Sequence, residues 1–442
     1  MGKTRLTRRE FLGKTSAGLA MASVVPRAVT TTSGNPNALA LKGGTPVRTK
    51  PFPDWPQTDS LDEANILKAL RNHRWCTYDG EFTPRFEKAW AAQIGAQGCV
   101  MTPCGTHALH MGLDLVGVGP GDEVVVAPFT YIATIDVILM CYALPVFADT
   151  DLRTFQIDPD DVERRITEHT RAILPVHISG APANMDKILA IAKKHNLPVV
   201  EDACQAHTAE WRGKRVGTLG NVGCFSFQET KVLPAGEGGA FVSNDQDLIA
   251  KAYMFRDFGW DSKRNSYAIR ATKFRQSEFA AAVLLAQLTR LESVCALREK
   301  HASCLMEEMR KIPGIFPQEN YAESTRQTYL VIVFRYDQTQ FHGLPRSRLI
   351  EALKAEGIPA GASYPPLNRG PFIEKTLNSR AYRTVFSKER LDRYREQNHC
   401  PNNDELCATS VFLDQHLLIG AKTDLDDILE AVAKVQKLAG TL

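Results

Sequence analysis

One lysine of this chain stands in a setting that suits covalent chemistry with an aldehyde. Lys231 lies between the apolar, strand-like run Phe225–Phe227 and the glycine-rich turn Gly236–Gly239. Upstream, the apolar run Leu197–Val200 leads to a second reactive group, the carboxylate of Asp202. A lysine amine can form a Schiff base, and a buried carboxylate can stabilise a protonated nitrogen heterocycle.

These two groups match the needs of pyridoxal 5'-phosphate. Its aldehyde needs an amine to hold it covalently, and its pyridine nitrogen needs an acid that keeps it protonated, so that the ring accepts electrons. Asp202 would be costly to bury without such a partner. We therefore predict that Lys231 and Asp202 are catalytic and bind this cofactor. The alternative for Asp202 is an aspartate that caps a loop.

A phosphate site is predicted where the strand-like run Cys99–Thr102 turns into a helix. Gly105 allows close approach, Thr106 adds a hydroxyl, and the first N–H groups of a helix attract an anion. A Gly-Thr pair before a helix is also common as a simple cap. Ser226, on the run that delivers Lys231, is a second candidate for binding phosphate, and the alternative is a core serine.

Two more side chains are predicted to contact the cofactor ring. Tyr131 follows the apolar run that ends at Ala127, so its ring can stack on the pyridine, although an aromatic side chain here also suits the core. Gln205 follows Asp202 closely and can reach the phenolate side of the ring. His177 and His207 are weaker candidates. Most of these residues follow strand ends, where open parallel sheets bind their ligands.

Strand-like and helical patterns alternate along much of the chain. The apolar runs are 123–127, 144–147, 172–176, 198–202, 222–227 and 239–243. They are continuously apolar, which predicts an α/β fold with a mainly parallel sheet covered by helices.

The domain division follows from a long helical pattern. It runs from Ser277 to about Lys311 and should bridge two domains. We expect a large domain over 41–295 and a smaller α+β domain over 296–442. The polar stretch 368–402 is predicted to be an irregular loop that closes over a site or reaches a second subunit.

Composition narrows the function classes. The 442 residues include 53 basic and 50 acidic side chains scattered along the chain, which argues against a nucleic-acid partner. The ten cysteines lack the CxxC spacing of a zinc or redox site, so no metal is predicted. No segment after the first forty residues is as long and apolar as a membrane span, so a soluble mature protein is expected.

The first forty residues have the pattern of an export signal. Arg8 and Arg9 precede a small, apolar stretch at 13–25. Residues 7–12 resemble the twin-arginine signal, which is used by proteins that fold around a cofactor before they cross the membrane. We predict a signal and linker, cleavage near Ala38–Ala40, and a periplasmic or extracytoplasmic protein, cytoplasmic if the signal is not used. A basic tail with a chance arginine pair is the alternative.

Beyond these single residues, the chain resembles the DegT-type family of pyridoxal-phosphate-dependent sugar and cyclitol aminotransferases. The resemblance covers nearly everything from 41 to 442. It rests on six landmarks in family order: Gly105–Leu109, Thr130–Thr134, Pro145–Asp149, Pro175–His177, Glu201–His207 and Gly236–Gly239. It implies the aspartate aminotransferase fold, which is the pyridoxal-phosphate-dependent transferase fold type I.

The resemblance also implies roles for individual residues. Lys231 would form the internal aldimine and Asp202 would bind the pyridine nitrogen. Tyr131 would stack on the ring, and Gln205 would lie beside it. The phosphate would be held by Gly105, Thr106 and Ser226. The implied reaction is a ping-pong transfer of an amino group from glutamine or glutamate to a keto-sugar or keto-cyclitol. A homodimer with an intersubunit site is expected.

Within the family, Ser226–Gln228 and Val411–Asp414 are most similar to the branch of scyllo-inosose aminotransferases and 3-amino-5-hydroxybenzoate synthase. Lys273 and Asn368 depart from the asparagine and histidine common in the family at segments that shape the acceptor side, which leaves the acceptor open. The sequence also leaves the amino donor and the stereochemistry open. The export signal keeps two alternatives in view. One is an exported lyase or dehydratase that needs no amino donor, and the other is a non-catalytic binding protein.

Overall fold

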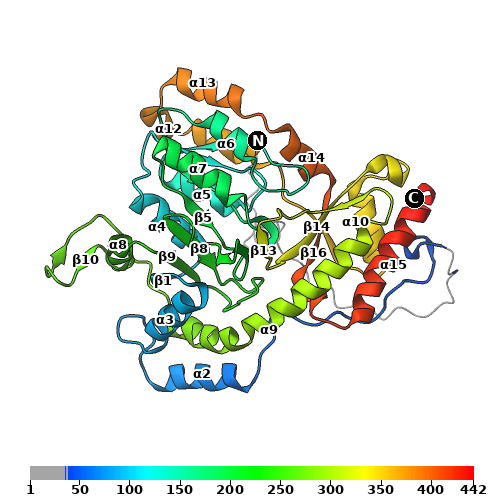
Figure 1. Ribbon diagram of the computed structural model, residues 1–442, viewed down its shortest axis with the longest axis horizontal. Helices are drawn as coiled ribbons and strands as arrows, with labels where there is room; N and C mark the ends of the chain where they lie inside the picture. Colours follow the sequence, from blue (N-terminus) through cyan, green and yellow to red (C-terminus); the bar gives the residue numbers. More distant parts are fainter. Residues whose placement is uncertain (1–34, 36–37) are drawn as a thin grey trace, which may run out of the picture.

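The computed structural model describes residue 35 and residues 38–442, so the predicted twin-arginine motif and its apolar stretch lie outside the described residues. Its main feature is a twisted sheet (Figure 1). A three-stranded part has the order β3 (Leu144–Phe147), β2 (Glu123–Val126), β4 (Thr170–Leu174). A four-stranded part has the order β1 (Gly98–Thr102), β9 (Gly239–Ser243), β8 (Val222–Ser226), β5 (Val200–Asp202).

Isolated parallel bridges join β4 to β5, so the two parts form one continuous sheet. Strand pairs are parallel except where β9 runs antiparallel to β1 and to β8. The predicted α/β fold with a mainly parallel sheet is therefore confirmed.

Helices cover both faces of this sheet. One face packs against α4 (Gly105–Leu115), α5 (Ile132–Met140) and α8 (Gln246–Arg256). The other packs against α3 (Phe82–Ile94), α6 (Pro159–Arg165), α7 (Met185–His195) and the first part of α9 (Glu278–Met309). Along β2, Val124 and Val126 enter the first core and Val125 enters the second. Burial of both faces explains why the strands are continuously apolar.

The smaller domain is built on an antiparallel sheet. Its strand order is β12 (Ile315–Pro317), β14 (Val331–Tyr336), β16 (Ser410–Asp414), β15 (Ala360–Ala362). It packs against α10 (Arg346–Ala355), α15 (Lys422–Leu438) and the end of α9. The domain boundary expected at 295 falls inside α9.

Helix α9 links the two domains. Within the described part of the chain, only α9 is long and apolar enough to cross a membrane by composition, although the sequence analysis expected no such segment. Its buried side chains, such as Leu284, Leu291 and Leu305, belong to the cores of both domains. This burial explains its apolar character as a core helix.

The stretch 368–402 is not the irregular loop that the sequence predicted. It contains α11 (Pro371–Leu377), α12 (Arg380–Val385), α13 (Lys388–Gln397) and the start of α14 (Pro401–Thr409). The hydroxyl of Tyr382 donates to the carbonyls of Leu139 and Ala143, and that of Tyr394 donates to the carbonyl of Pro145. These helices are short and largely polar, and two buried tyrosines anchor them to the large domain, so their apolar periodicity is weak.

Residues 38–57 form a segment that we call the N-terminal strap. Leu39 is 1% exposed within the core of the small domain, and the N–H of Ala40 donates to Glu356 (2.8 Å). The predicted cleavage region, residues 38–40, therefore lies in a packed segment. The start of the predicted large domain packs on the small one.

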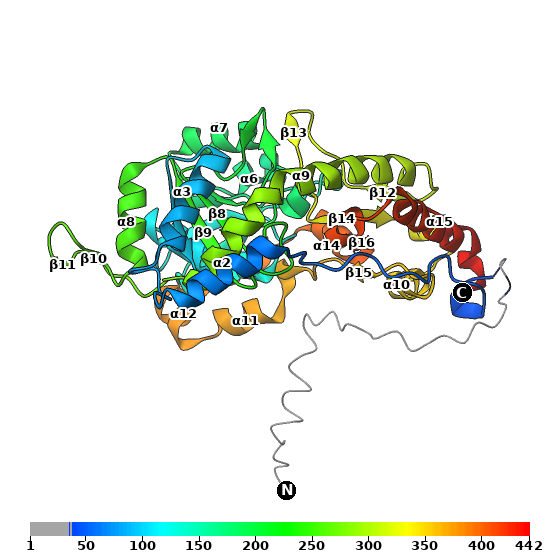
Figure 2. The same cartoon turned by 90° about the horizontal axis from the view of Figure 1, so that it is seen from below.

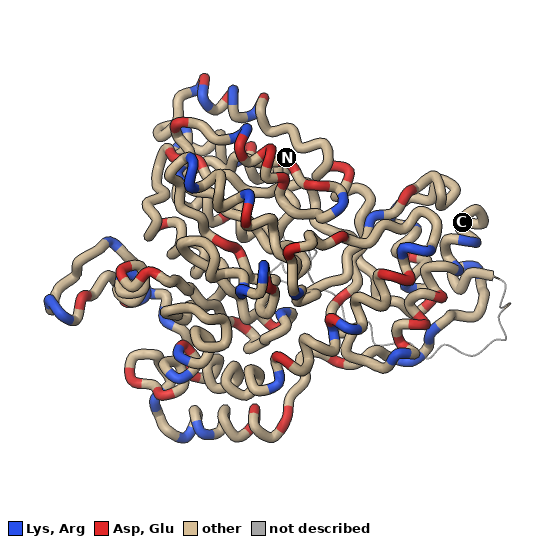
Figure 3. Tube along the Cα trace, in the orientation of Figure 1, with Lys and Arg blue, Asp and Glu red and all other residues tan. Residues whose placement is uncertain are grey.

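The strap leads into α2 (Ser60–Arg71), whose capping box is formed by Asp59 and Asp62. A small sheet of β13 (Ser324–Arg326), β6 (Glu210–Trp211) and β7 (Lys214–Arg215) lies at the domain junction. The hairpin of β10 (Trp260–Asp261) and β11 (Ser266–Tyr267) projects from the large domain (Figure 1). Basic and acidic residues are interspersed over both domains (Figure 3).

Candidate active site

The predicted residues come from the same edge of the large-domain sheet. Asp202 ends β5, Ser226 ends β8, Gly105 begins the helix after β1, and Tyr131 is the N-cap of the helix after β2. Lys231 lies in the turn that follows β8. Because the carboxyl ends of parallel strands meet at one edge, the topology gathers these side chains at a ligand-binding position.

The carboxylate of Asp202 is buried and held on both oxygens. Thr134 donates its hydroxyl to Oδ2 (2.8 Å), and the N–H of Cys204 donates to Oδ1 (3.1 Å). The hydroxyl of Thr130 lies 3.0 Å from that of Thr134 and is placed to donate to it, which orients the chain of hydroxyls toward Asp202. The Asp202 side chain is only 4% exposed, so this arrangement fixes a carboxylate for a cationic partner. The sequence analysis missed Thr134.

The Lys231 amine makes no hydrogen bond or ion pair with any described residue. It is half-buried, and burial lowers its pKa, against the opposing effects of Cys204 and Asp202. The lowered pKa favours the neutral amine, which is the nucleophilic form. Lys231 follows β8, and β8 pairs with β5, the strand that ends at Asp202.

The start of α4 forms a tight cradle. A Cβ atom on Gly105 would lie 2.8 Å from both the Cys204 sulfur and the Ser226 Cβ, so this position requires glycine. Gly239 packs equally closely, because its Cβ would lie 2.6 Å from the Gly105 nitrogen. No side-chain cap hydrogen bond satisfies the first N–H groups of α4, and Thr106 lies in its first turn. These features fit a phosphate group.

The ring-binding candidates differ in how they are held. Tyr131 is 44% exposed, which leaves its ring available for stacking. Gln205 is buried: it accepts from the N–H of Ser179 (2.9 Å) and donates to the hydroxyl of Tyr364 (3.0 Å). Tyr364 comes from the segment between β15 and α11 and packs edge-on against Phe129 (5.4 Å between ring centroids). The sequence did not predict this contact of Gln205.

Neither weaker histidine candidate lines the site. His177 is fully buried and accepts from the N–H of Ala183, so its other nitrogen donates to Glu201 (2.9 Å). His207 donates to the carbonyl of Ser226 (2.7 Å), and burial lowers its pKa to about 3. His207 is therefore neutral near pH 7 and supports the end of β8.

The two departures from the family pattern lie in different surroundings. Asn368 is buried and accepts from the side-chain amide of Asn403 (3.0 Å), while its own amide donates to the carbonyl of Asn398. It therefore joins α14 to the loop before α11. Lys273 is exposed at the base of the β10–β11 hairpin, where its backbone forms an isolated antiparallel β-bridge with that of Asp257.

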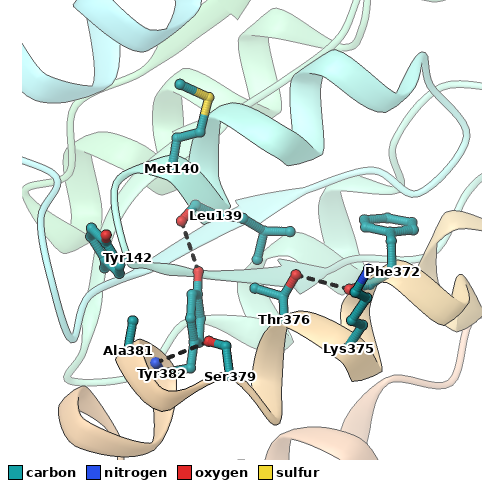
Figure 4. Close-up of a pocket in the computed structure, with 9 residues that line it drawn as sticks. All are labelled: Leu139, Met140, Tyr142, Phe372, Lys375, Thr376, Ser379, Ala381 and Tyr382. Atoms are coloured by element: carbon teal, nitrogen blue, oxygen red, sulfur yellow. Dashed lines mark hydrogen bonds between the residues drawn. The ribbon is translucent and has the colours of Figure 1, made fainter.

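A separate surface groove of about 640 Å³ lies between the end of α5 and helices α11 and α12 (Figure 4). Leu139, Met140, Phe372 and Tyr382 contribute to its lining, and none of the predicted site residues does. Tyr131 stands at the opposite end of α5. The groove is therefore not part of the candidate active site.

The residues at the sheet edge together fit pyridoxal phosphate. Gly105 packs against Ser226 too closely for a side chain on Gly105, and Thr106 follows in the first turn of α4. The unpaired Lys231 amine follows β8, which pairs with the strand that ends at Asp202. Asp202 keeps both oxygens oriented by donors, as a partner of a protonated ring nitrogen requires.

Comparison with known proteins gives the family. The DegT/DnrJ/EryC1/StrS aminotransferase family matches residues 57–411. The L-glutamine:2-deoxy-scyllo-inosose aminotransferase of Streptoalloteichus tenebrarius is 35% identical over 92% of this chain and 99% of its own length. The 3-amino-5-hydroxybenzoate synthase of Amycolatopsis mediterranei is 32% identical over 86% of this chain and 96% of its own length.

Solved structures agree with this result. The crystal structure of 3-amino-5-hydroxybenzoic acid synthase has a TM-score of 0.80 and 32% identity, covering 88% of this chain and 99% of that protein. DesV of S. venezuelae, solved with a ketimine intermediate, has a TM-score of 0.72 and 30% identity, covering 85% of this chain and 94% of that protein. The resemblance and the fold predicted from the sequence are confirmed: this chain belongs to the DegT/DnrJ/EryC1/StrS aminotransferase family and is an aminotransferase.

Proposed function

We propose that this aminotransferase uses pyridoxal phosphate to move the amino group of L-glutamine to the ketone of a keto-cyclitol. The observation that carries the proposal is the unpaired, half-buried Lys231 amine next to the doubly hydrogen-bonded Asp202 carboxylate. The named substrates of the scyllo-inosose relatives support this choice of amino donor and acceptor.

The cofactor, when bound, supplies an electron sink for the negative charge that develops at the α-carbon of the amino donor. Asp202 would face the ring nitrogen, and its two hydrogen bonds keep the carboxylate oriented. Gly105, Thr106 and Ser226 would hold the phosphate, and the exposed ring of Tyr131 would stack on the cofactor ring.

Lys231 has two tasks in this mechanism. Its amine would hold the cofactor covalently. When free, the same amine would act as a general base and acid that moves the α-proton of the amino donor. The lowered pKa of Lys231 suits both tasks, because each requires a neutral amine. The same two roles would serve the half of the ping-pong cycle that consumes the ketone.

The test is an amino-transfer assay with control reactions that lack the amino donor. Purified protein is incubated with L-glutamine labelled with ¹⁵N at the α-amino group and with 2-deoxy-scyllo-inosose, and products are identified by mass spectrometry. The proposal predicts a ¹⁵N-labelled amino-cyclitol that forms only when the amino donor is present. Conversion of the cyclitol without any amino donor would instead identify a lyase or dehydratase, and no conversion of either compound would contradict the proposed substrates.

We infer that the protein forms a homodimer. Support comes from α2 and the segment after it, where Leu67, Leu70, Trp75 and Tyr78 are 43–77% exposed. Such a run of large apolar side chains is typical of an interface, and twofold dimers are the most common oligomers. Light scattering is expected to give twice the chain mass, and Leu67→Glu is expected to shift the protein toward monomer. A monomeric wild type would contradict the dimer.

We also propose export through the twin-arginine route, which the sequence of residues 7–25 supports. The test compares cell fractions of the wild type with those of a variant carrying Arg8→Lys and Arg9→Lys. Export predicts that the wild type is extracytoplasmic and that the variant is retained in the cytoplasm. A cytoplasmic wild type would contradict it.

A further inference from the structure

The turn that carries Lys231 is held from outside the large domain. The indole N–H of Trp55, from the N-terminal strap, donates to the carbonyls of Glu229 (3.1 Å) and Lys231 (3.2 Å). The side-chain amide of Gln415, from the small domain, donates to the carbonyl of Thr230 (2.7 Å). Three successive carbonyls of the lysine turn are thus bound by two distant segments.

The other backbone hydrogen bonds of the turn are local. The N–H of Lys231 donates to the carbonyl of Gln228 (2.8 Å), and that of Thr230 donates to the Gln228 side chain (2.8 Å). The N–H of Glu229 donates to the carbonyl of Gly236 (2.9 Å), and that of Ala235 donates to the carbonyl of Phe227 (2.8 Å). These bonds join residues 227–236 to one another, so they set the local shape of the turn. Its position relative to the small domain depends on Trp55 and Gln415.

A buried cation fixes the indole of Trp55. The guanidinium of Arg298, on α9, lies 4.5 Å from the centre of the Trp55 ring. Arg298 is fully buried, and its Nε and Nη2 atoms have no hydrogen-bond partner among the described residues. A buried guanidinium with so few partners favours the face of an aromatic ring, so this contact holds the indole in one orientation.

The strap is anchored on both sides of Trp55. On one side, Arg48 is 6% exposed and forms ion pairs with Asp424 and Asp427 of α15, each at 2.7 Å. On the other side, Gln287 of α9 donates to the carbonyl of Gln57 (2.9 Å). The strap therefore runs from the small domain to the large one, and its path is visible as the dark blue segment in Figure 2. Trp55 lies between the two anchors.

We propose that Trp55 and Gln415 are positioning residues for Lys231, which place the lysine backbone through hydrogen bonds to its turn. The amine side chain stays free to move, while its attachment point is fixed to the strap and the small domain. This inference rests on the proposed role of Lys231, and the position of the turn can be measured separately from the reaction.

The test uses Trp55→Phe, which keeps an aromatic ring for Arg298 but removes the N–H donor, and Gln415→Leu, which removes the second donor. Hydrogen exchange of residues 228–236 is measured on the full chain, without cofactor and with it. One lost hydrogen bond of about 1 kcal/mol corresponds to roughly fivefold faster exchange in this turn. With cofactor and amino donor, kcat is expected to fall about fivefold to tenfold while the KM for the amino donor changes little.

Trp211→Phe is the matched control. The indole of Trp211 donates to Asp186 (2.8 Å) in another part of the large domain, so this variant also removes an indole hydrogen bond but is expected to leave exchange of 228–236 unchanged. Faster exchange in the turn for both Trp55→Phe and Gln415→Leu would support the proposal, even if the protein accepts neither of the proposed substrates. Wild-type exchange in both variants would overturn it. If Trp55→Phe fails to fold, Gln415→Leu alone decides the outcome by the same criterion.

Discussion

Asp202 and Lys231 face the same site, yet the protein holds them in opposite ways. The Asp202 side chain is buried and bound on both oxygens by Thr134 and Cys204, which belong to the same domain. The Lys231 side chain has no hydrogen-bond partner among the described residues, whereas its backbone turn is bound by Trp55 and Gln415 from distant segments.

This difference corresponds to the tasks proposed for the two groups. A carboxylate that keeps a ring nitrogen protonated must not move, so rigid donors around it are an advantage. An amine that attacks, leaves and then carries a proton must move, so only its attachment point can be fixed. The predictions below test each side of this comparison.

The largest expected effect comes from removing the amine. Lys231→Ala should lower kcat by at least about 10⁴-fold, because both the covalent attachment and the general base are lost. Steady-state transfer assays measure this change, with Lys214→Ala as the control, since Lys214 is exposed on β7. Activity of Lys231→Ala within tenfold of the wild type would exclude Lys231 as the catalytic amine.

Removing the charge of Asp202 should have the second largest effect. Asp202→Asn keeps the size of the side chain and one oxygen that accepts hydrogen bonds, but it cannot stabilise a cationic ring nitrogen. We expect kcat to fall on the order of 10²–10³-fold while the protein keeps its fold, measured by transfer assays and circular dichroism. An unchanged kcat would show that the rigid carboxylate is not used in the reaction.

The hydroxyl that orients Asp202 should matter less than its charge. Thr134→Val removes one hydrogen bond and keeps the shape of the side chain. A hydrogen bond to a charged group contributes about 1.5 kcal/mol, so its loss should lower kcat about tenfold. Thr134→Ser restores the hydroxyl and is expected to recover most of the activity. If Thr134→Ser and Thr134→Val are equally impaired, packing rather than the hydrogen bond is responsible.

The free Lys231 amine predicts a pH-dependent stability in the cofactor-free protein. Its folded pKa is lowered below the ordinary value of 10.5, so the unfolded chain binds more protons between these two values, and wild-type stability rises with pH through that window. Lys231→Met should therefore be more stable than the wild type at pH 7, and this gain should fade as the pH approaches 10.5. Urea unfolding at several pH values measures it; a gain independent of pH would contradict the lowered pKa.

Asp414 offers the smallest effect and a contrast with Asp202. It has no side-chain hydrogen bond to a described residue, and burial raises its pKa from 3.8 to about 6. Between these pH values the folded chain binds more protons than the unfolded chain, so the stability of the wild type falls as the pH rises from 3.8 to about 6. Asp414→Asn should be about 1–2 kcal/mol more stable at pH 7.5, after allowing for partial exposure, and equal to the wild type below pH 4. Equal stability at pH 7.5 would show that Asp414 is solvated.

The strand ends could be predicted from sequence because each is a local pattern. A continuous apolar run followed by a polar residue marks β5 and Asp202, and the run before Lys231 marks β8 in the same way. The parallel topology then brings these ends together without further information. Gly105 also lies at such a strand end, just after β1, and the structure shows that its surroundings leave no room for a side chain.

The remaining features depend on contacts between distant segments. Trp55 and Gln415 lie far from Lys231 in the sequence, one near the start of the described chain and the other near its end. No local sequence pattern therefore connects either of them to Lys231. Thr134 lies in a helix, where a threonine is usually an ordinary core or surface residue. Its hydrogen bond to Asp202 was therefore not predicted from the sequence. The helices α11–α13 were missed because buried tyrosines such as Tyr382, rather than a regular apolar stripe, hold them in place.

The most direct test of the account is the absorption spectrum of the purified full-length protein with pyridoxal phosphate, recorded before and after L-glutamine is added. We predict a band near the visible edge that disappears on adding L-glutamine and returns on adding the keto-cyclitol, and that is absent from Lys231→Ala. A bound cofactor whose spectrum does not respond to L-glutamine or L-glutamate, or a band that persists in Lys231→Ala, would contradict it.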